Sequence, residues 1–69
     1  MTKILTIEGM MCSHCVSHVE EALKKINGVM EVAVNLETKT AKVISDIEIS
    51  DNVFKEVISE EGYEVTNIE

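Results

Sequence analysis

The spacing of the apolar residues constrains the fold of this chain more than any other feature, because it switches twice from alternation to a helical period and back. Residues 3–8 alternate, with Leu5 and Ile7 on one face, which predicts a strand. From Cys15 onward, apolar residues recur at steps of three and four, which predicts a helix with one apolar face. That face consists of Val16, Val19, Ala22, Leu23 and Ile26. The chain is therefore expected to begin with a strand and a helix.

The middle of the chain returns to alternation. Asn27 and Gly28 are expected to end the first helix, and residues 32–36 predict a second strand. Residues 37–39 predict a tight turn, and residues 41–43 predict a third strand whose apolar side chains share the same face. The two strands on either side of the turn are therefore expected to form a hairpin.

A second helix follows, with its start marked by Ser50. The Ser50 side chain is a suitable N-cap, and Ile49 and Phe54 are placed on either side of it to form a hydrophobic staple. Gly62 is placed to end this helix. Residues 63–66 then predict a closing strand.

The resulting βαββαβ order predicts an α+β fold of the ferredoxin-like type, a sandwich of a four-stranded antiparallel sheet with two helices on one face. The chain has 69 residues, no proline and no low-complexity stretch, so residues 1–69 are expected to form a single domain. A domain of this size buries roughly 60% of the surface of its unfolded chain. It has little room for a deep catalytic cleft, and we expect no enzymatic activity.

The formal net charge of −7 comes from the last third of the chain. Residues 46–69 hold eight acidic residues and one lysine, whereas the rest of the chain holds five of each. A nucleic-acid partner is disfavoured, because binding phosphates requires a basic surface. The one pair of adjacent lysines, Lys24 and Lys25, is matched by glutamates four residues earlier.

The amino-terminal residues lack an apolar run long enough for a signal peptide, and no stretch approaches the ~20 apolar residues of a membrane span. We therefore expect a soluble cytoplasmic protein without membrane insertion. Thiols stay reduced in the cytosol, so a close pair of cysteines is expected there to bind metal or act in redox chemistry rather than form a structural disulfide.

Cys12 and Cys15 carry most of the chemical information in the chain. Thiolates are soft ligands that select Cu(I), zinc and iron–sulfur centres. Zinc sites and iron–sulfur clusters usually need about four ligands, so a lone pair better suits an ion that is satisfied with two. Cu(I) is therefore the leading candidate. Unpaired backbone N–H groups at the start of a helix also favour the thiolate of Cys15, which is expected in the first turn.

The segment that holds the cysteines has the sequence Gly9-Met10-x-Cys12-x-x-Cys15 between the first strand and the first helix. It resembles the motif of the heavy-metal-associated domain family, and the resemblance covers the whole chain. Further matching segments are Gly28-Val29, Val32-x-Val34-Asn35-Leu36 and Gly62-Tyr63. Within the family, the chain is most similar to free bacterial copper chaperones that deliver Cu(I) to copper-transporting P-type ATPases.

This resemblance implies that Cys12 and Cys15 are the metal ligands and that Met10 is turned inward, packing beneath the loop instead of binding copper. It implies transfer of Cu(I) by ligand exchange to the metal-binding domain of such an ATPase. The commonest family motif has threonine where this chain has Met11. Met11 is either an exposed or packing side chain or a second soft thioether beside the site.

Three further side chains lie near the motif in the sequence or in the expected fold. His14, between the ligands, has three readings: it tunes the thiolates, serves as an extra ligand in a copper-bridged homodimer, or is simply exposed. His18 could complete a three-ligand zinc set with Cys12 and Cys15, although zinc would still lack a fourth ligand. Tyr63 is expected in a loop beside the cysteines, where bacterial chaperones typically have tyrosine, and it either supports the site or covers the core.

Alternative functions remain open at this point. A cytosolic Cys-x-x-Cys is also the signature of thiol–disulfide oxidoreductases, although thioredoxin-like proteins are longer and place a cis-proline beside the pair. Other members of the family bind mercury, zinc or cadmium. The chain could also be a metal-binding module excised from a P-type ATPase, although Met1 and Tyr63 favour a free chaperone.

Overall fold

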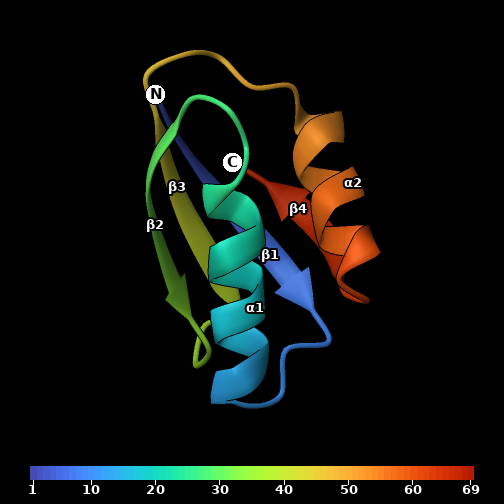
Figure 1. Ribbon diagram of the computed structural model, residues 1–69. Coiled ribbons are helices and arrows are strands. Elements are labelled where there is room, and N and C mark those ends of the chain that lie inside the picture. Colours follow the sequence, from blue (N-terminus) through green and yellow to red (C-terminus); the bar gives the residue numbers. More distant parts are fainter.

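The element order is the predicted one. The computed structural model describes residues 1–69 and contains β1 (Thr2–Glu8), α1 (Ser13–Lys24), β2 (Val29–Asn35), β3 (Thr40–Ser45), α2 (Asp51–Glu60) and β4 (Glu64–Ile68). The strands form one antiparallel sheet in the order β2-β3-β1-β4. Both helices cover the same face of this sheet (Figure 1). The ferredoxin-like βαββαβ fold is thereby confirmed.

The expected boundaries of the second strand were wrong at both ends. β2 begins at Val29, three residues earlier than predicted, and pairs there with β3. It ends at Asn35, whose side-chain oxygen accepts hydrogen bonds from the N–H groups of Glu37 (2.9 Å) and Thr38 (3.2 Å). These bonds start the turn at Asn35, so Leu36 lies in the turn although its apolar side chain fits the alternation.

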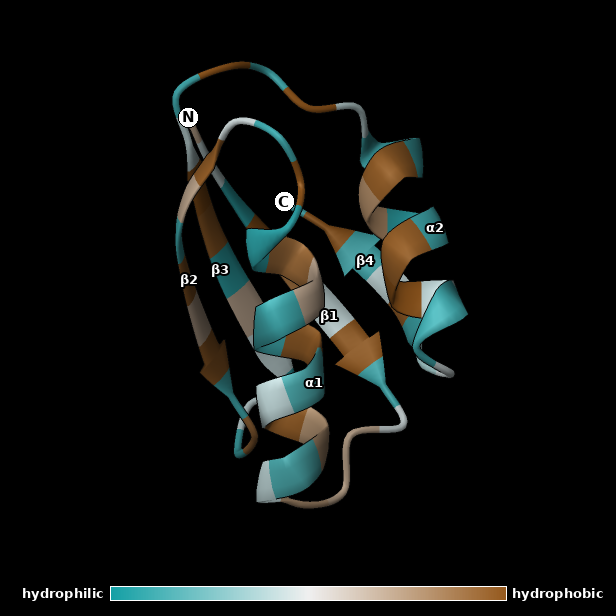
Figure 2. Cartoon of the chain, viewed as in Figure 1, coloured by the Kyte–Doolittle hydropathy of each residue, from teal (hydrophilic) through white to brown (hydrophobic).

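The core lies between the sheet and the two helices. Leu5 and Ile7 of β1 are fully buried, as their alternation predicts. The buried cluster consists of Leu5, Ile7, Met10, Val19, Leu23, Ala41, Val43, Ile49, Phe54 and Ile58. Both helices mix hydrophobic and hydrophilic residues along their length (Figure 2), as helices with one buried face do. The core therefore takes its residues from both helices, from the two central strands and from the loops that precede the helices, and from neither edge strand.

The start of α2 is defined by Ser50 and the residues around it. The Ser50 side chain accepts a hydrogen bond from the N–H of Asn52 at 3.3 Å, which confirms the predicted N-cap. Ile49 and Phe54 are both buried in the core cluster, as the predicted hydrophobic staple requires. These contacts fix α2 against the sheet and with it the turn that follows the helix.

Two loops meet at the end of the sheet where β1 finishes. β4 pairs with β1, and this pairing places Glu64 beside Glu8. The β1–α1 loop and the α2–β4 turn therefore lie next to each other at the lower end of Figure 1. Gly9 has a φ of +103°, and a Cβ at this position would lie 3.1 Å from Cδ1 of Tyr63. The close approach of the two loops thus requires glycine at position 9.

Candidate metal centre

The two cysteines lie where the β1–α1 loop enters the first helix. Cys12 is the extended N-cap residue of α1, and Cys15 lies in its first turn, as predicted. Their Sγ atoms are 3.5 Å apart, well beyond the ~2.0 Å of a disulfide bond. Both thiols are free. The fold therefore directs two reduced sulfur atoms toward one point.

The two sulfurs differ in their surroundings. Cys12 is exposed to solvent, whereas Cys15 is half-buried and packs against the core cluster. The thiol of Cys15 is consequently anchored by the body of the protein, and the thiol of Cys12 is directly accessible to an approaching molecule.

Hydrogen bonds lower the pKa of Cys15 from 9.0 to about 7. The largest contribution comes from the backbone N–H of Met11, followed by the hydroxyl of Tyr63 and the thiol of Cys12. Each donor stabilises the charged form of the sulfur. The expectation that the Cys15 thiolate is favoured is thus confirmed, and a substantial fraction of it is present at neutral pH.

The pKa of Tyr63 shifts in the opposite direction to that of Cys15. Its hydrogen bond to Cys15, together with desolvation and the nearby thiolate charge, raises the pKa of Tyr63 to about 12. The hydroxyl therefore stays protonated and remains a donor. Its ring is half-buried, packs against the core cluster and approaches Gly9. Tyr63 thus lies beside the cysteines as expected, and it covers the core as well.

Two adjacent methionines take opposite positions at the loop. Met10 is only 4% exposed and belongs to the core cluster, which confirms that it is turned inward. Met11 is 86% exposed. Met10 therefore holds the loop to the core, while the side chain of Met11 extends into solvent beside Cys12.

The two histidines do not join the cysteines. His14 and His18 are both exposed. No group of three or more His, Cys, Asp or Glu side chains is close enough to hold one metal ion. The three-ligand set of Cys12, Cys15 and His18 is thus not assembled in this structure.

One contact at the site was missed from the sequence. The hydrogen bond from the Met11 backbone to Cys15 is the largest influence on the Cys15 pKa. Every residue except proline has a backbone N–H, so no side-chain signal marks this donor. Only the general expectation of unpaired N–H groups at a helix start pointed toward it.

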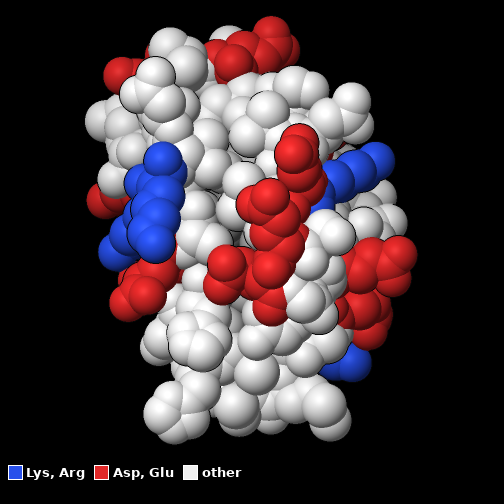
Figure 3. Space-filling view, turned by 45° about the vertical axis from the view of Figure 1, so that its right-hand side comes forward, with Lys and Arg blue, Asp and Glu red and all other residues white.

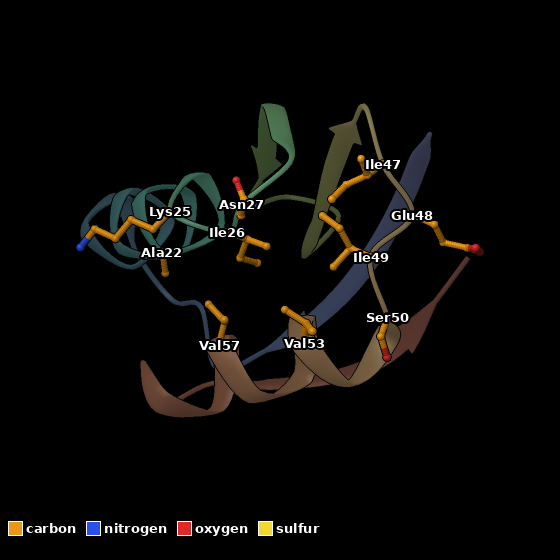
Figure 4. A pocket seen from close by; sticks show the side chains of 10 residues that line it. All are labelled: Ala22, Lys25, Ile26, Asn27, Ile47, Glu48, Ile49, Ser50, Val53 and Val57. Carbon is orange, nitrogen blue, oxygen red and sulfur yellow. The ribbon is translucent and has the colours of Figure 1, made fainter.

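The largest hollow in the molecule is not at the cysteines. It is a groove of about 510 Å³ between the end of α1 and the start of α2. In Figure 4, Val53 and Val57 rise from α2 toward Ile26, whereas Lys25 and Glu48 extend away from the groove. The two thiols lie at the opposite end of α1, on an open surface.

Acidic side chains are concentrated away from that surface. In Figure 3 they run down the middle and right of the face that α2 occupies, and the lower end, where the β1–α1 loop lies, is almost entirely uncharged. In addition, neither helix has the length and apolar character needed to cross a membrane.

Comparisons with known proteins point to a single family. The model of the heavy-metal-associated domain matches residues 4–64. The copper chaperone CopZ of Staphylococcus epidermidis is 44% identical over 64 residues, which span 91% of this chain and 94% of that protein.

Solved structures give the same result. A structure described as the CopZ metallochaperone superposes with a TM-score of 0.89 and 40% identity, covering 96% of this chain and all of the other. A copper-binding domain from HMA7, a P-type ATPase, superposes with a TM-score of 0.85 and 33% identity over 100% of this chain and 99% of the other.

Proposed function

The chain belongs to the heavy-metal-associated domain family, and on that premise we propose that it is a copper chaperone that binds Cu(I) through Cys12 and Cys15 and passes it to a copper-transporting P-type ATPase. The observation that carries this proposal is the convergence of two free sulfurs, 3.5 Å apart, at the exposed start of α1. The similarity to CopZ over nearly the whole of both proteins supports copper as the cargo.

The donor set suits a monovalent soft ion. Two thiols and no third His, Cys, Asp or Glu ligand fit Cu(I) better than a four-coordinate structural zinc ion. The two sulfurs lie 3.5 Å apart, close enough to share one ion. The exposed Cys12 is the one with more freedom to adjust its position to the ion.

The residues around the pair have separate roles in this proposal. The lowered pKa of Cys15 supplies a thiolate for the ion near neutral pH. The Tyr63 hydroxyl donates to that sulfur and so tunes its charge. Met10, buried beneath the loop, holds the loop in place without contacting the ion.

Transfer follows from the exposure of Cys12. A thiolate of the partner domain forms a bond to Cu(I) before the bond to Cys12 breaks, so that the ion passes through a three-coordinate state. The second thiolate of the partner then replaces Cys15. Each copper–sulfur bond broken is matched by one formed, and no redox change occurs. The protein is therefore a carrier of metal and not an enzyme.

The partner is proposed to meet the protein at the end that carries the cysteines, where Figure 3 shows few charged side chains. The docking surface comprises the Cys12–Cys15 loop, the start of α1 and the turn at Tyr63, which the exposed Glu61 and Glu64 flank. A domain of similar fold occurs in the P-type ATPase HMA7, so both partners could present cysteine loops of the same kind. We place the exchange in the cytoplasm, where thiols stay reduced.

We further propose that residues 1–69 act as a single domain.

We also propose that His14, exposed between the ligands, can bridge copper in a homodimer. Measuring the size of the copper-loaded protein tests this homodimer, because His14→Ala should remain monomeric where the unaltered protein associates.

A second candidate is a metal-binding module of an ATPase, favoured by the 33% identity to the HMA7 domain over the full length of this chain. The cysteine chemistry is the same in both cases. Mercury, zinc or cadmium as cargo, and thiol–disulfide exchange as activity, are the remaining alternatives.

Anaerobic competition against chelators of known affinity tests the proposal. Cu(I) should bind tightly with one ion per chain, and Zn(II) and Hg(II) titrated in parallel decide the metal class. Cys12→Ser and Cys15→Ser should each abolish tight Cu(I) binding, while circular dichroism shows an intact fold. Retention of full Cu(I) affinity by either variant would refute the site. Reduction of insulin disulfides by the free protein would instead support the oxidoreductase.

A further inference from the structure

Met11 is the most exposed large apolar side chain of the protein. It is 86% exposed and directly precedes Cys12, whereas the neighbouring Met10 is 4% exposed. A thioether is a soft donor of the kind that binds Cu(I). The loop therefore presents a third sulfur atom to solvent beside the two thiols.

A two-sulfur site leaves a coordination position for a third donor. No His, Cys, Asp or Glu side chain completes a group of three with the cysteines. The side chain of Met10 is enclosed in the core. Met11 is consequently the soft donor at the rim of the site that is free to turn toward an ion.

The backbone places Met11 within reach of the pair. Met11 directly precedes Cys12, the N-cap residue of α1, so the main chain of Met11 adjoins the site. The methionine side chain is unbranched and has three rotatable bonds, which lets it adapt to a neighbouring group. No packing contact with the core restrains it, since the side chain is almost fully exposed.

We propose that the thioether of Met11 is a third, weak ligand of the Cu(I) ion held by Cys12 and Cys15. This inference rests on the proposed copper-binding function. The thioether is neutral and donates a lone pair to the ion, so no proton or electron is exchanged. It occupies the third position in the resting complex and leaves when the partner's thiolate arrives, which slows loss of copper to small competing chelators without blocking transfer.

The test compares Met11→Leu with Met30→Leu. Leucine is similar in volume to methionine and lacks the sulfur. Met30 is a matched control, because it is also exposed, at 64%, and lies at the start of β2, away from the cysteines. The readouts are the Cu(I) dissociation constant from chelator competition and the ¹³C resonances of the methionine methyl groups on addition of Cu(I).

Met11→Leu should bind Cu(I) about tenfold more weakly, the lower end of the range for loss of a supporting group at a metal site. Met30→Leu should match the unaltered protein. Cu(I) should shift the methyl resonance of Met11 and leave that of Met30 in place. A dissociation constant for Met11→Leu within twofold of the unaltered protein overturns the inference, whatever the methyl resonance does.

This outcome is separable from failure of the proposed function. If the unaltered protein does not bind Cu(I) tightly, the chaperone proposal fails, and the inference about Met11 fails with it. If the unaltered protein binds Cu(I) tightly and Met11→Leu binds it equally well, only the inference about Met11 fails.

Discussion

Tyr63 and Cys15 lie side by side, and the interaction of the Tyr63 hydroxyl with the Cys15 sulfur shifts their pKa values in opposite directions. After the backbone N–H of Met11, the hydroxyl is the second contribution that lowers the pKa of Cys15 to about 7. The same interaction is the largest of the causes that raise the pKa of Tyr63 to about 12. The two residues come from opposite ends of the chain and meet because β4 pairs with β1. A residue of the α2–β4 turn thereby acts on the chemistry of the first helix.

Tyr63→Phe removes this donor and keeps the ring. The thiolate of Cys15 loses one of its stabilising hydrogen bonds, so the pKa of Cys15 should rise from about 7 toward 9.0. Alkylation of the metal-free protein by iodoacetamide should consequently require a higher pH, with a slower rate at pH 7 than for the unaltered protein. Peptide mapping assigns the rate to Cys15. A pH profile unchanged by the substitution would show that the hydroxyl does not act on the thiolate.

Met10→Ala should destabilise the fold. Met10 is 4% exposed within the core cluster, and truncation of a buried methionine costs about 2–5 kcal/mol. Any loss of copper affinity should be secondary to this effect. Met11→Ala is the control, since an 86% exposed side chain contributes little to stability. Urea denaturation of the metal-free proteins gives both values. Unchanged stability of Met10→Ala combined with lost copper binding would instead make Met10 a ligand.

Gly9→Ala should disturb the contact between the two loops. Gly9 has a positive φ, and its added Cβ would lie 3.1 Å from the Tyr63 ring. Gly62 is the matched control, because it has a similar φ of +92° with no atom within 4 Å of an added Cβ.

Both substitutions introduce left-handed strain of roughly 1–2 kcal/mol. Only Gly9→Ala should in addition move Tyr63 and raise the pKa of Cys15. Denaturation curves and alkylation against pH measure the two effects. Equal pKa values of Cys15 in the two variants would argue against a steric role for Gly9.

Copper transfer should involve only the end of the molecule that carries the cysteines. In two-dimensional NMR of the labelled, copper-loaded protein with an ATPase metal-binding domain, shifts should appear in residues 9–15 and at Tyr63. Most of the acidic surface lies along α2, away from the cysteine loop, although Glu61 and Glu64 flank Tyr63, and salt screens charges beyond ~8 Å at physiological ionic strength. The salt dependence should therefore be modest. Shifts confined to α2, or copper that passes only through a pool that a chelator can trap, would contradict direct exchange.

Much of the fold follows from the sequence, because its signals act over short range. The two spacings of apolar residues predict which segments become strands and helices, and the order of these segments restricts the sheet to very few arrangements. Ser50 marks the start of α2 through a contact two residues away. The predicted end of β2 was wrong because two local signals conflict. The alternation of apolar residues continues through Leu36, but the side chain of Asn35 already starts the turn.

The cysteine pair was equally evident from the sequence, since its spacing of two residues at a helix start brings the sulfurs together locally. The inward position of Met10 came from the family resemblance and the place of Tyr63 from the expected fold, and neither follows from local spacing. Whether Met10 or Met11 is buried depends on how the β1–α1 loop lies over the core. The bond between Tyr63 and Cys15 exists only once β4 has paired with β1. The sequence by itself therefore determined the closeness of the two cysteines that we propose as ligands. The tertiary structure decided the pKa of Cys15 and the exposure of both cysteines, because these depend on groups distant along the chain or on the path of the backbone.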